Sequence, residues 1–233
     1  MTLEKARSLA TDVLALPSGR GVTVGIFPPF TALSAVSAIT RNTPLGLGAQ
    51  DCSSHAEYGA YTGEVSAQML KDVGCGYVIS GHSERRQYHG ETNCLIRSKA
   101  EAALKAGLKV VICVGESLDE RKQGIHLKVI SEQVRECLPS LLHSNDTIIA
   151  YEPVWAIGSG ATPTIAEISE VHKTIASLLT YATPATRTSI VYGGSVKAAN
   201  AREILSAEAV DGALVGGASL KPDEFGAIIS AAS

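Results

Sequence analysis

The chain has 233 residues, of which 45% are hydrophobic and 18% charged, and its formal net charge is −3 at pH 7. This length and apolar content suffice to bury the core of a single domain spanning residues 1–233. Acidic and basic residues are interspersed along the chain, which argues against nucleic acid and membrane surfaces as partners. No apolar run approaches the ~18 residues of a membrane span, and residues 1–12 lack the apolar region of a signal peptide.

The five cysteines are an odd number without close pairing, which predicts reduced thiols, a cytoplasmic location and no zinc site. Short apolar runs alternate with segments of helical periodicity. We expect strands at Val22–Phe27, Leu45–Ala49, Tyr77–Ser80, Lys109–Val114, Thr147–Tyr151, Ser189–Tyr192 and Asp211–Val215. We expect helices at residues 2–16, Ala67–Val73, Cys94–Ala106, Gly124–Leu138, Ile165–Tyr181 and Ala198–Ser206. This alternation predicts an α/β fold, and continuous apolar strands predict a parallel sheet buried on both faces.

A lone carboxylate, Glu152, directly follows one predicted strand, and Pro153 restricts the backbone beside it. The next residues place Trp155 ahead of Gly158 and Gly160, a rigid apolar tip beside mobile ends that is typical of a lid. In an α/β barrel the catalytic groups lie at the carboxyl ends of the strands. The alternative interpretation is an ordinary strand–loop–helix corner with a surface glutamate.

Most of the other predicted strands also end in glycine or a polar side chain. Glycine pairs follow the last two strands, Gly193-Gly194 before Ser195 and Gly216-Gly217, and they suit a phosphate site because glycine lets the backbone approach an anion. His82 follows the strand Tyr77–Ser80 and precedes a segment that is typical of a helix start. A histidine in such a place is more often structural than catalytic, so this position alone leaves both readings open.

Four segments resemble signatures of the triosephosphate isomerase family. They are YVISGHSERR at 77–86, AYEPVWAIGSG at 150–160, YGGSV at 192–196 and DGALVGGASL at 211–220, with further similarity at 49–70 and 111–116. The resemblance implies an eight-stranded (β/α)8 TIM barrel that is usually a homodimer. It also implies interconversion of dihydroxyacetone phosphate and D-glyceraldehyde 3-phosphate, in glycolysis and gluconeogenesis, without a metal or organic cofactor.

By the same resemblance, Glu152 would be the base that moves a proton between two carbons, and His82 the neutral electrophile that polarises the carbonyl. Triosephosphate isomerases are a standard example of this pair. Glu84 would be a supporting carboxylate in the site, with an ordinary ion pair as the alternative. The residues that would hold the substrate phosphate are Gly158, Ser195, Gly216 and Gly217.

The segment Ser53–Ser66 is long for a loop of this fold. In the family it reaches into the other subunit, which would place Thr62 near the partner's active site and pair Glu64 with Arg85 across the interface. A mobile surface loop is the alternative. Asp51 stands where the family usually has asparagine, and the sequence assigns it no role. Two other strand-end residues are expected to be structural, Cys113 and Glu116.

The family opens with a strand that ends in an Asn–x–Lys motif, and no such segment precedes Val22. We therefore expect an incomplete barrel of about seven strands with two unpaired edges, a weakened dimer, and activity impaired by the missing lysine. Either the start of the chain is misassigned or trimmed, or the chain is naturally short with lost or altered activity. Two alternatives to the isomerase remain: a non-catalytic barrel that binds small phosphates or serves as an interaction module, and another phosphate-binding barrel enzyme.

Overall fold

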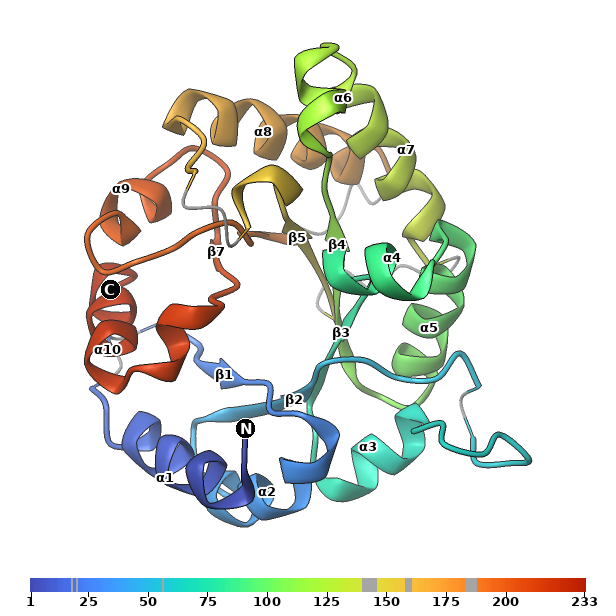
Figure 1. The fold of residues 1–233 in the computed structure, drawn as a ribbon, viewed down its shortest axis with the longest axis vertical. Coiled ribbons are helices and arrows are strands. Elements are labelled where there is room, and N and C mark those ends of the chain that lie inside the picture. The colour runs from blue at the N-terminus through green and yellow to red at the C-terminus, as the bar shows by residue number, and fades with distance from the viewer. Residues whose placement is uncertain (18, 20, 56, 140–145, 158–160, 183–187) are drawn as a thin grey trace.

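The computed structural model describes residues 1–17, 19, 21–55, 57–139, 146–157, 161–182 and 188–233. Within them, seven parallel strands form one sheet in the order β1-β2-β3-β4-β5-β6-β7. The strands are β1 (Gly25–Ile26), β2 (Gly46–Ala49), β3 (Tyr77–Ser80), β4 (Lys109–Val114), β5 (Thr147–Tyr151), β6 (Ser189–Tyr192) and β7 (Gly212–Ala213). The sheet curls round a central axis with the helices outside it (Figure 1), which confirms the predicted incomplete TIM barrel.

The helices surround the sheet and connect successive strands (Figure 1). They are α1 (Leu3–Leu14), α2 (Leu33–Thr40), α3 (Ala67–Val73), α4 (Ser83–His89), α5 (Asn93–Lys105), α6 (Leu118–Lys122), α7 (His126–Cys137), α8 (Ile165–Ala182), α9 (Ala201–Leu205) and α10 (Pro222–Ala231). Three short 3-10 turns are η1 (Phe30–Ala32), η2 (Val154–Ala156) and η3 (Gly217–Leu220). Because each strand pairs with the next one along the chain, the carboxyl ends of all seven strands lie at one rim.

The register of the central strands determines which residues meet at this rim. Val114 of β4 lies beside Tyr151 of β5, and Tyr151 lies beside Tyr192 of β6. The residues that directly follow these three positions are Gly115, Glu152 and Gly193. The sheet therefore carries the predicted carboxylate between two glycines, which leave room around it.

Two layers of apolar side chains hold the sheet in place. On the helix side, Ile112, Ile149 and Ile190 lie in the main core and are at most 2% exposed. On the side of the barrel axis, Val111 and Cys113 belong to a smaller buried cluster, so Cys113 is buried as expected. This burial on both faces explains why the central strands have continuous apolar sequences.

The outer strands are shorter than predicted. The expected strand Val22–Phe27 pairs only at Gly25–Ile26, and the expected strand Asp211–Val215 pairs only at Gly212–Ala213. Each of these strands has one neighbour in the described sheet, since β1 pairs with β2 and β7 with β6. A strand paired on one side only has less to hold its ends in register, which explains the shortening.

Other predicted boundaries agree more closely. The first helix was expected at residues 2–16 and spans Leu3–Leu14, and the Thr2 side chain caps it by accepting a hydrogen bond from the Lys5 backbone. Three helices of the described residues were missed, Leu33–Thr40, Leu118–Lys122 and Pro222–Ala231, and Ser83–His89 was expected only as a helix start. The first and the third are rich in alanine, serine and isoleucine and carry few charges to mark a polar face, so their periodicity is weak in the sequence.

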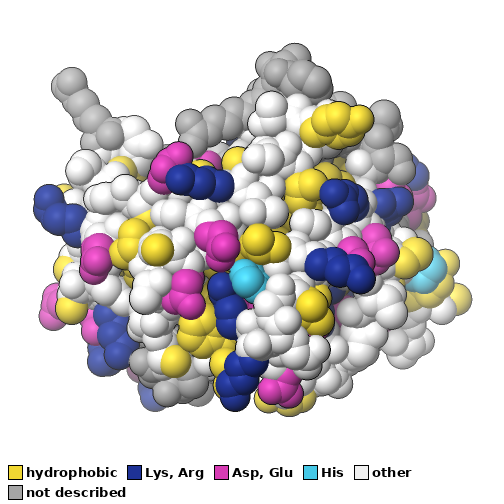
Figure 2. Space-filling view, turned by 90° about the horizontal axis from the view of Figure 1, so that it is seen from above, with side chains coloured by type: hydrophobic (Ala, Val, Ile, Leu, Met, Phe, Trp, Pro, Cys, Tyr) yellow, Lys and Arg dark blue, Asp and Glu magenta, His cyan; other side chains and the backbone are white. Residues whose placement is uncertain are grey.

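One face of the molecule, seen from above in Figure 2, shows basic and acidic side chains interspersed with scattered apolar ones. No large field of a single sign covers this face, in line with the mixed charge pattern of the sequence. Among the described residues, no helix is both long enough and apolar enough to cross a membrane.

Candidate active site

The carboxylate of Glu152 lies at the rim of the barrel, and the residue is only 1% exposed. Its backbone N–H donates to the Val114 carbonyl oxygen at 2.7 Å, which continues the pairing of β4 and β5 by one residue. Its Oε2 accepts a hydrogen bond from the backbone N–H of Ser83 at 2.8 Å. A buried carboxylate needs such a partner, because an unpaired charge away from water is costly.

The second oxygen of this carboxylate faces His82. The distance from Glu152 Oε1 to His82 Nε2 is 3.3 Å, but the two groups are not aligned as a hydrogen bond, and Oε1 has no hydrogen-bond partner among the described residues. The structure therefore brings together the two side chains that the sequence predicts as base and electrophile. One oxygen of the carboxylate is fixed by the backbone and the other is available.

His82 is positioned by the start of helix α4, where it is the capping residue. Its Nδ1 accepts a hydrogen bond from the backbone N–H of Glu84 at 3.3 Å. In a neutral imidazole one nitrogen accepts and the other carries the hydrogen, so Nε2 is the donor and faces the Glu152 carboxylate. The Glu84 carboxylate lies 3.9 Å from Nδ1 and its side chain is 68% exposed, so it points away from Glu152 into solvent.

Two glycines pack directly against Glu152. A Cβ added to Gly115 would overlap the carbonyl oxygen of Glu152, and one added to Gly193 would lie 2.8 Å from its Cγ. Gln133 of α7 holds Gly115 from outside: the Gly115 N–H donates to Oε1 of Gln133 at 2.8 Å, and Nε2 of Gln133 donates to the Gly115 carbonyl at 2.9 Å. Gln133 could not be singled out from the sequence, because a polar residue on a helix is ordinary.

The predicted phosphate residues lie on neighbouring strand ends. Ser195 follows β6, and its hydroxyl donates to the carbonyl of Ala156 at 2.6 Å, which ties the end of β6 to the segment after Glu152. Gly216 and Gly217 follow β7 and are exposed, η3 begins at Gly217, and added Cβ atoms at both would meet nothing within 4 Å. Gly158 lies outside the described residues.

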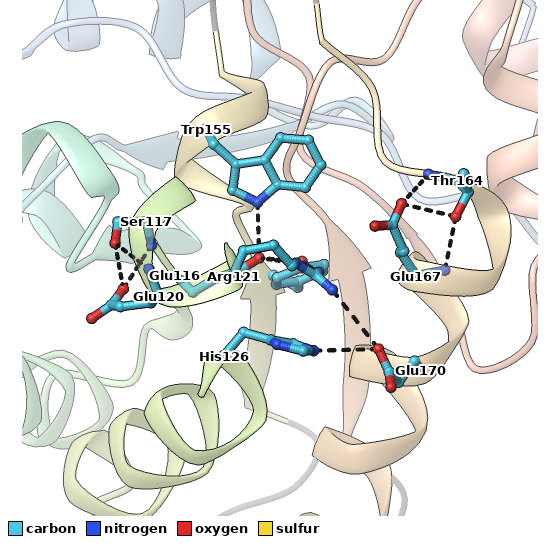
Figure 3. A network of polar contacts seen from close by, with 10 residues as sticks. Glu116, Ser117, Glu120, Arg121, His126, Trp155, Thr164, Glu167 and Glu170 are labelled. Carbon is cyan, nitrogen blue, oxygen red and sulfur yellow. Dashed lines mark hydrogen bonds and ion pairs between the residues drawn. The ribbon is translucent and has the colours of Figure 1, made fainter. Parts of the chain in front are cut away.

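A polar network holds Trp155, the apolar tip of the expected lid (Figure 3). The indole Nε1–H donates to Oε1 of Glu116 at 2.9 Å, and the Nε of Arg121 donates to the same oxygen at 3.0 Å. The hydroxyl of Tyr151 donates to it at 3.2 Å and accepts from Arg121 at 3.0 Å. Glu116 is structural, as expected, but it also anchors the loop that follows Glu152.

The same network extends outward to helix α8. Arg121 lies 3.8 Å from Oε2 of Glu170, and His126 Nε2 lies 3.3 Å from that oxygen (Figure 3). Arg121 also stacks over the ring of Trp155 at 5.8 Å from its centroid. The sequence prediction missed Arg121. It could have been found from its position five residues after Glu116, on a helix that Ser117 caps.

Asp51, which had no assigned role, belongs to a buried cluster of four charges. Lys99 Nζ lies 2.7 Å from its Oδ1 and 2.5 Å from Oε1 of Glu91, and Arg85 Nε lies 3.0 Å from Asp51 and 2.6 Å from Glu91. Burial raises the pKa of Asp51, although Lys99 opposes the shift. Burial also disfavours the Glu91 carboxylate, but hydrogen bonds from Lys99 and Arg85 outweigh it and lower the pKa of Glu91.

This cluster joins the end of β2 to helices α4 and α5 and so supports the helix that carries His82. Arg85 is engaged inside its own chain, whereas its expected partner Glu64 is exposed. Thr62 is exposed in the same loop, in which Tyr58 and Tyr61 are 78% and 43% exposed. The structure thus presents this loop on the surface with two aromatic side chains.

Known proteins are similar to this chain over almost its whole length. A profile of the triosephosphate isomerase family matches residues 1–232. The triosephosphate isomerase of Pelodictyon phaeoclathratiforme is 50% identical over 230 residues, covering 97% of this chain and 91% of that protein. That of Rhizobium meliloti is 45% identical over 232 residues, covering 99% and 90%.

A solved structure supports the same assignment. The crystal structure of triosephosphate isomerase from Bartonella henselae superimposes with a TM-score of 0.88 at 40% sequence identity, covering 98% of this chain and 92% of that one. The family profile, the identity of the relatives and the shared fold agree over almost the whole chain. The chain belongs to the triosephosphate isomerase family.

Proposed function

We propose that in this isomerase Glu152 is the base and His82 the electrophile in the interconversion of dihydroxyacetone phosphate and D-glyceraldehyde 3-phosphate. The observation that carries the assignment is the pair of buried Glu152 and partly exposed His82 at the barrel rim, with 3.3 Å between Nε2 and Oε1. Glu152 removes a proton from the carbon beside the carbonyl, and the Nε2–H of His82 donates to the oxygen on which negative charge develops. A proton also passes from the hydroxyl oxygen to the former carbonyl oxygen beside His82 Nε2, and return of the carbon-bound proton to the neighbouring carbon completes the isomerisation.

The two oxygens of the Glu152 carboxylate have different surroundings before substrate binds. The Ser83 N–H holds one carboxylate oxygen at 2.8 Å, while the other oxygen lies unpaired against His82. A substrate that enters between them separates the carboxylate from the imidazole and offers each a new partner. The contact between Glu152 and His82 is therefore replaced by one contact to carbon and one to oxygen, which is the arrangement that proton transfer beside a carbonyl requires.

The substrate phosphate is proposed to bind the ends of β6 and β7, through Ser195, Gly216 and Gly217, with Gly158 closing over it from the loop after Glu152. Exposed glycine backbone at the start of η3 suits close approach of an anion. The hydrogen bond from Ser195 to Ala156 connects this phosphate region to the loop anchored by Trp155. Phosphate binding would thus help close the loop and exclude water.

A homodimer and a cytoplasmic location complete the proposal. Tyr58 and Tyr61 expose aromatic surface in the loop that carries Thr62 and Glu64, and aromatic side chains are enriched in protein interfaces. Glu84 is proposed to support the site after substrate binds.

The cysteines support the cytoplasmic location. Four of the five are buried free thiols, and burial raises the pKa of Cys52 to about 12, which keeps that thiol protonated and unreactive.

The test is a coupled isomerase assay with D-glyceraldehyde 3-phosphate on the unaltered chain and on Glu152→Gln. The amide keeps the shape but cannot accept the proton, so kcat should fall by about 10²- to 10⁴-fold. Glu57→Gln, at an exposed glutamate, is the matched control and should leave kcat unchanged. Equal turnover in Glu152→Gln would refute the assignment of the base.

A different outcome would revive the alternative of a non-catalytic barrel. If the unaltered chain binds dihydroxyacetone phosphate in calorimetry but gives no turnover, it retains a phosphate site without the isomerase reaction. The two measurements therefore separate loss of chemistry from loss of binding.

A further inference from the structure

We propose that Arg86 of helix α4 is a positioning residue for the isomerase reaction. Its guanidinium group joins the peptide bond before His82 to the end of β4, and so determines how far His82 lies from Glu152. The inference rests on the proposed function, because it takes Glu152 and His82 as the reacting pair. It adds a residue that acts on this pair through the backbone.

The pairing of β3 with β4 stops just before the site. Its last pair is Ser80 with Ile112, so Gly81 and Cys113 would be the next pair if the ladder continued. The chain leaves the strand at Gly81, where φ is 72°, a left-handed conformation that favours glycine. Both residues are buried, so their carbonyl groups need hydrogen-bond donors from outside the ladder.

Arg86 supplies these donors from α4, which lies across the ends of β3 and β4 (Figure 1). Its Nε donates to the Gly81 carbonyl at 3.0 Å, and its Nη2 donates to the Cys113 carbonyl at 2.9 Å. Its backbone N–H also donates to the His82 carbonyl at 3.1 Å. The one residue therefore binds the carbonyls on both sides of the His82 Cα and a third carbonyl on β4.

The far side of the guanidinium is held as well. Nη1 of Arg86 donates to Oδ1 of Asn93 at 2.6 Å, at the start of α5, and Nη2 lies 3.5 Å from the sulfur of Cys137, at the end of α7. Asn93 is fixed in turn, because its Nδ2 donates to Glu136 at 2.8 Å. Only a planar, forked guanidinium can bind acceptors in several directions at once, which a lysine ammonium does not reproduce.

The end of β4 leads directly to the proposed base. The carbonyl of Val114, the residue after Cys113, accepts the Glu152 backbone N–H at 2.7 Å. Burial raises the pKa of the Cys113 thiol, and the negative charge of Glu152 beside it raises that pKa further. A shift of α4 relative to β4 would therefore change the 3.3 Å between His82 Nε2 and Glu152 Oε1, and Arg86 is the side chain that opposes such a shift.

The coupled isomerase assay on Arg86→Met and Arg86→Lys tests this role. Arg86→Met removes every side-chain donor, so kcat should fall about 100-fold, the typical cost of a displacement of ~1 Å. Arg86→Lys keeps the positive charge but loses the fork, and its kcat should lie between the two. KM should change much less than kcat in both variants, because the proposed phosphate residues follow β6 and β7.

Arg97 provides the matched control, since it is also an arginine that binds a backbone carbonyl. Its Nη2 donates to the carbonyl of Arg135 at 2.9 Å, a bond that joins α5 to α7 away from the strand ends. Arg97→Met and Arg97→Lys should lower the midpoint of thermal unfolding and leave kcat and KM unchanged. A merely structural role of Arg86 would give its variants this same pattern.

A second measurement does not depend on turnover. Nitrogen-15 NMR follows the imidazole of His82, whose resonances are identified by their loss in His82→Gln. In Arg86→Lys the resonances of Nε2 and its proton should move, because the distance to the Glu152 carboxylate changes while the positive charge is retained. In Arg97→Lys they should stay where they are in the unaltered chain.

Two results would overturn the inference: an unchanged kcat in folded Arg86→Met, and unchanged His82 resonances in Arg86→Lys. Circular dichroism shows whether each variant is folded, and if Arg86→Met is not, Arg86→Lys decides both measurements. Failure of the proposed function has a different signature. In that case the unaltered chain and Glu152→Gln have equal turnover, and the NMR comparison still decides whether Arg86 positions His82.

Discussion

The strands β4 and β5 differ from β1 and β7 in length and burial, although all four belong to one parallel sheet. The central pair have six and five residues, nearly all buried, whereas the outer pair have two residues each and are only partly buried. Their sequences differ less than this, since Val22–Phe27 has four hydrophobic residues of six and Thr147–Tyr151 four of five. The number of neighbours, and not the propensity of the residues, therefore determines how much of an apolar run becomes strand.

This difference has a functional side. The proposed base, the histidine and the glycines that make room for them follow β3, β4, β5 and β6, where strand pairing is longest. A site held by well-packed elements keeps its geometry more accurately than one held by short edges. Strand β7 adjoins the proposed phosphate region, because Gly216 and Gly217 follow it.

The largest effect that tests this contrast is on stability. Ile149→Ala, in the middle of β5 at 0% exposure, should lower the free energy of unfolding by about 2–5 kcal/mol, because it leaves a cavity in a close-packed core. Val24→Ala, beside β1, removes a partly exposed side chain and should cost less than about 1 kcal/mol. Urea unfolding measures both. Equal losses would show that the side chains beside β1 are as tightly packed as those of β5.

Activity should show the same contrast between glycines. Gly115→Ala forces Glu152 to move because the new methyl group overlaps its carbonyl oxygen, so kcat should fall about 100-fold, a typical result of a displacement of ~1 Å. Gly212→Ala in β7 meets Val191 at an acceptable 3.4 Å and should retain kcat within about two-fold. The isomerase assay measures kcat of both variants, and thermal unfolding shows whether each variant is folded. Unchanged kcat in Gly115→Ala would contradict the positioning argument.

The stability of the folded chain should depend on pH through a buried histidine of α8, which packs against β5 and β6. His172 of α8 is 0% exposed beside Tyr151 and Tyr192, and its Nδ1–H donates to the Ala209 carbonyl at 3.0 Å. Burial lowers its pKa below the usual 6.5, although the hydrogen bond to Ala209 opposes the shift. The unfolded chain therefore binds this proton first as pH falls, and the folded state loses stability.

The expected slope follows from linkage. The contribution of His172 is fully present above pH 6.5 and is lost below it, at up to about 1.4 kcal/mol per pH unit, until the lowered folded pKa is reached. Urea unfolding of the unaltered chain and of His172→Gln from pH 7.5 to 5.5 isolates this component. Parallel pH profiles in the two proteins would show that His172 is not its source.

The smallest expected effect concerns the loop after Glu152. Trp155→Phe removes the indole donor to Glu116, leaving that carboxylate with Arg121 and Tyr151 as partners. The loss of one hydrogen bond to a shared acceptor should cost about 1 kcal/mol, or roughly five-fold in kcat/KM. Steady-state kinetics measure it. A loss in kcat that is larger than the loss in stability would indicate that the hydrogen bond from Trp155 to Glu116 contributes to closure of the loop.

Much of this architecture could be predicted from the sequence. Apolar runs bounded by turns located the seven strands that the described residues form, because burial on both faces leaves a continuous apolar signal. The segments around His82 and Glu152 identified the family, and the structure places their side chains 3.3 Å apart. Helix α2 was missed, because its small and β-branched residues give a weak helical period.

The sequence by itself determined the strand order, the family and the identity of the proposed catalytic pair, because these depend on local patterns that repeat along the chain. Only the tertiary structure decided which partners Asp51, Gln133 and Arg121 contact. Five of these contacts join residues that lie 18 or more positions apart in the chain. The tertiary structure also decided how short β1 and β7 become. Long-range contacts leave no local periodicity, so their consequences become readable only when the chain is folded.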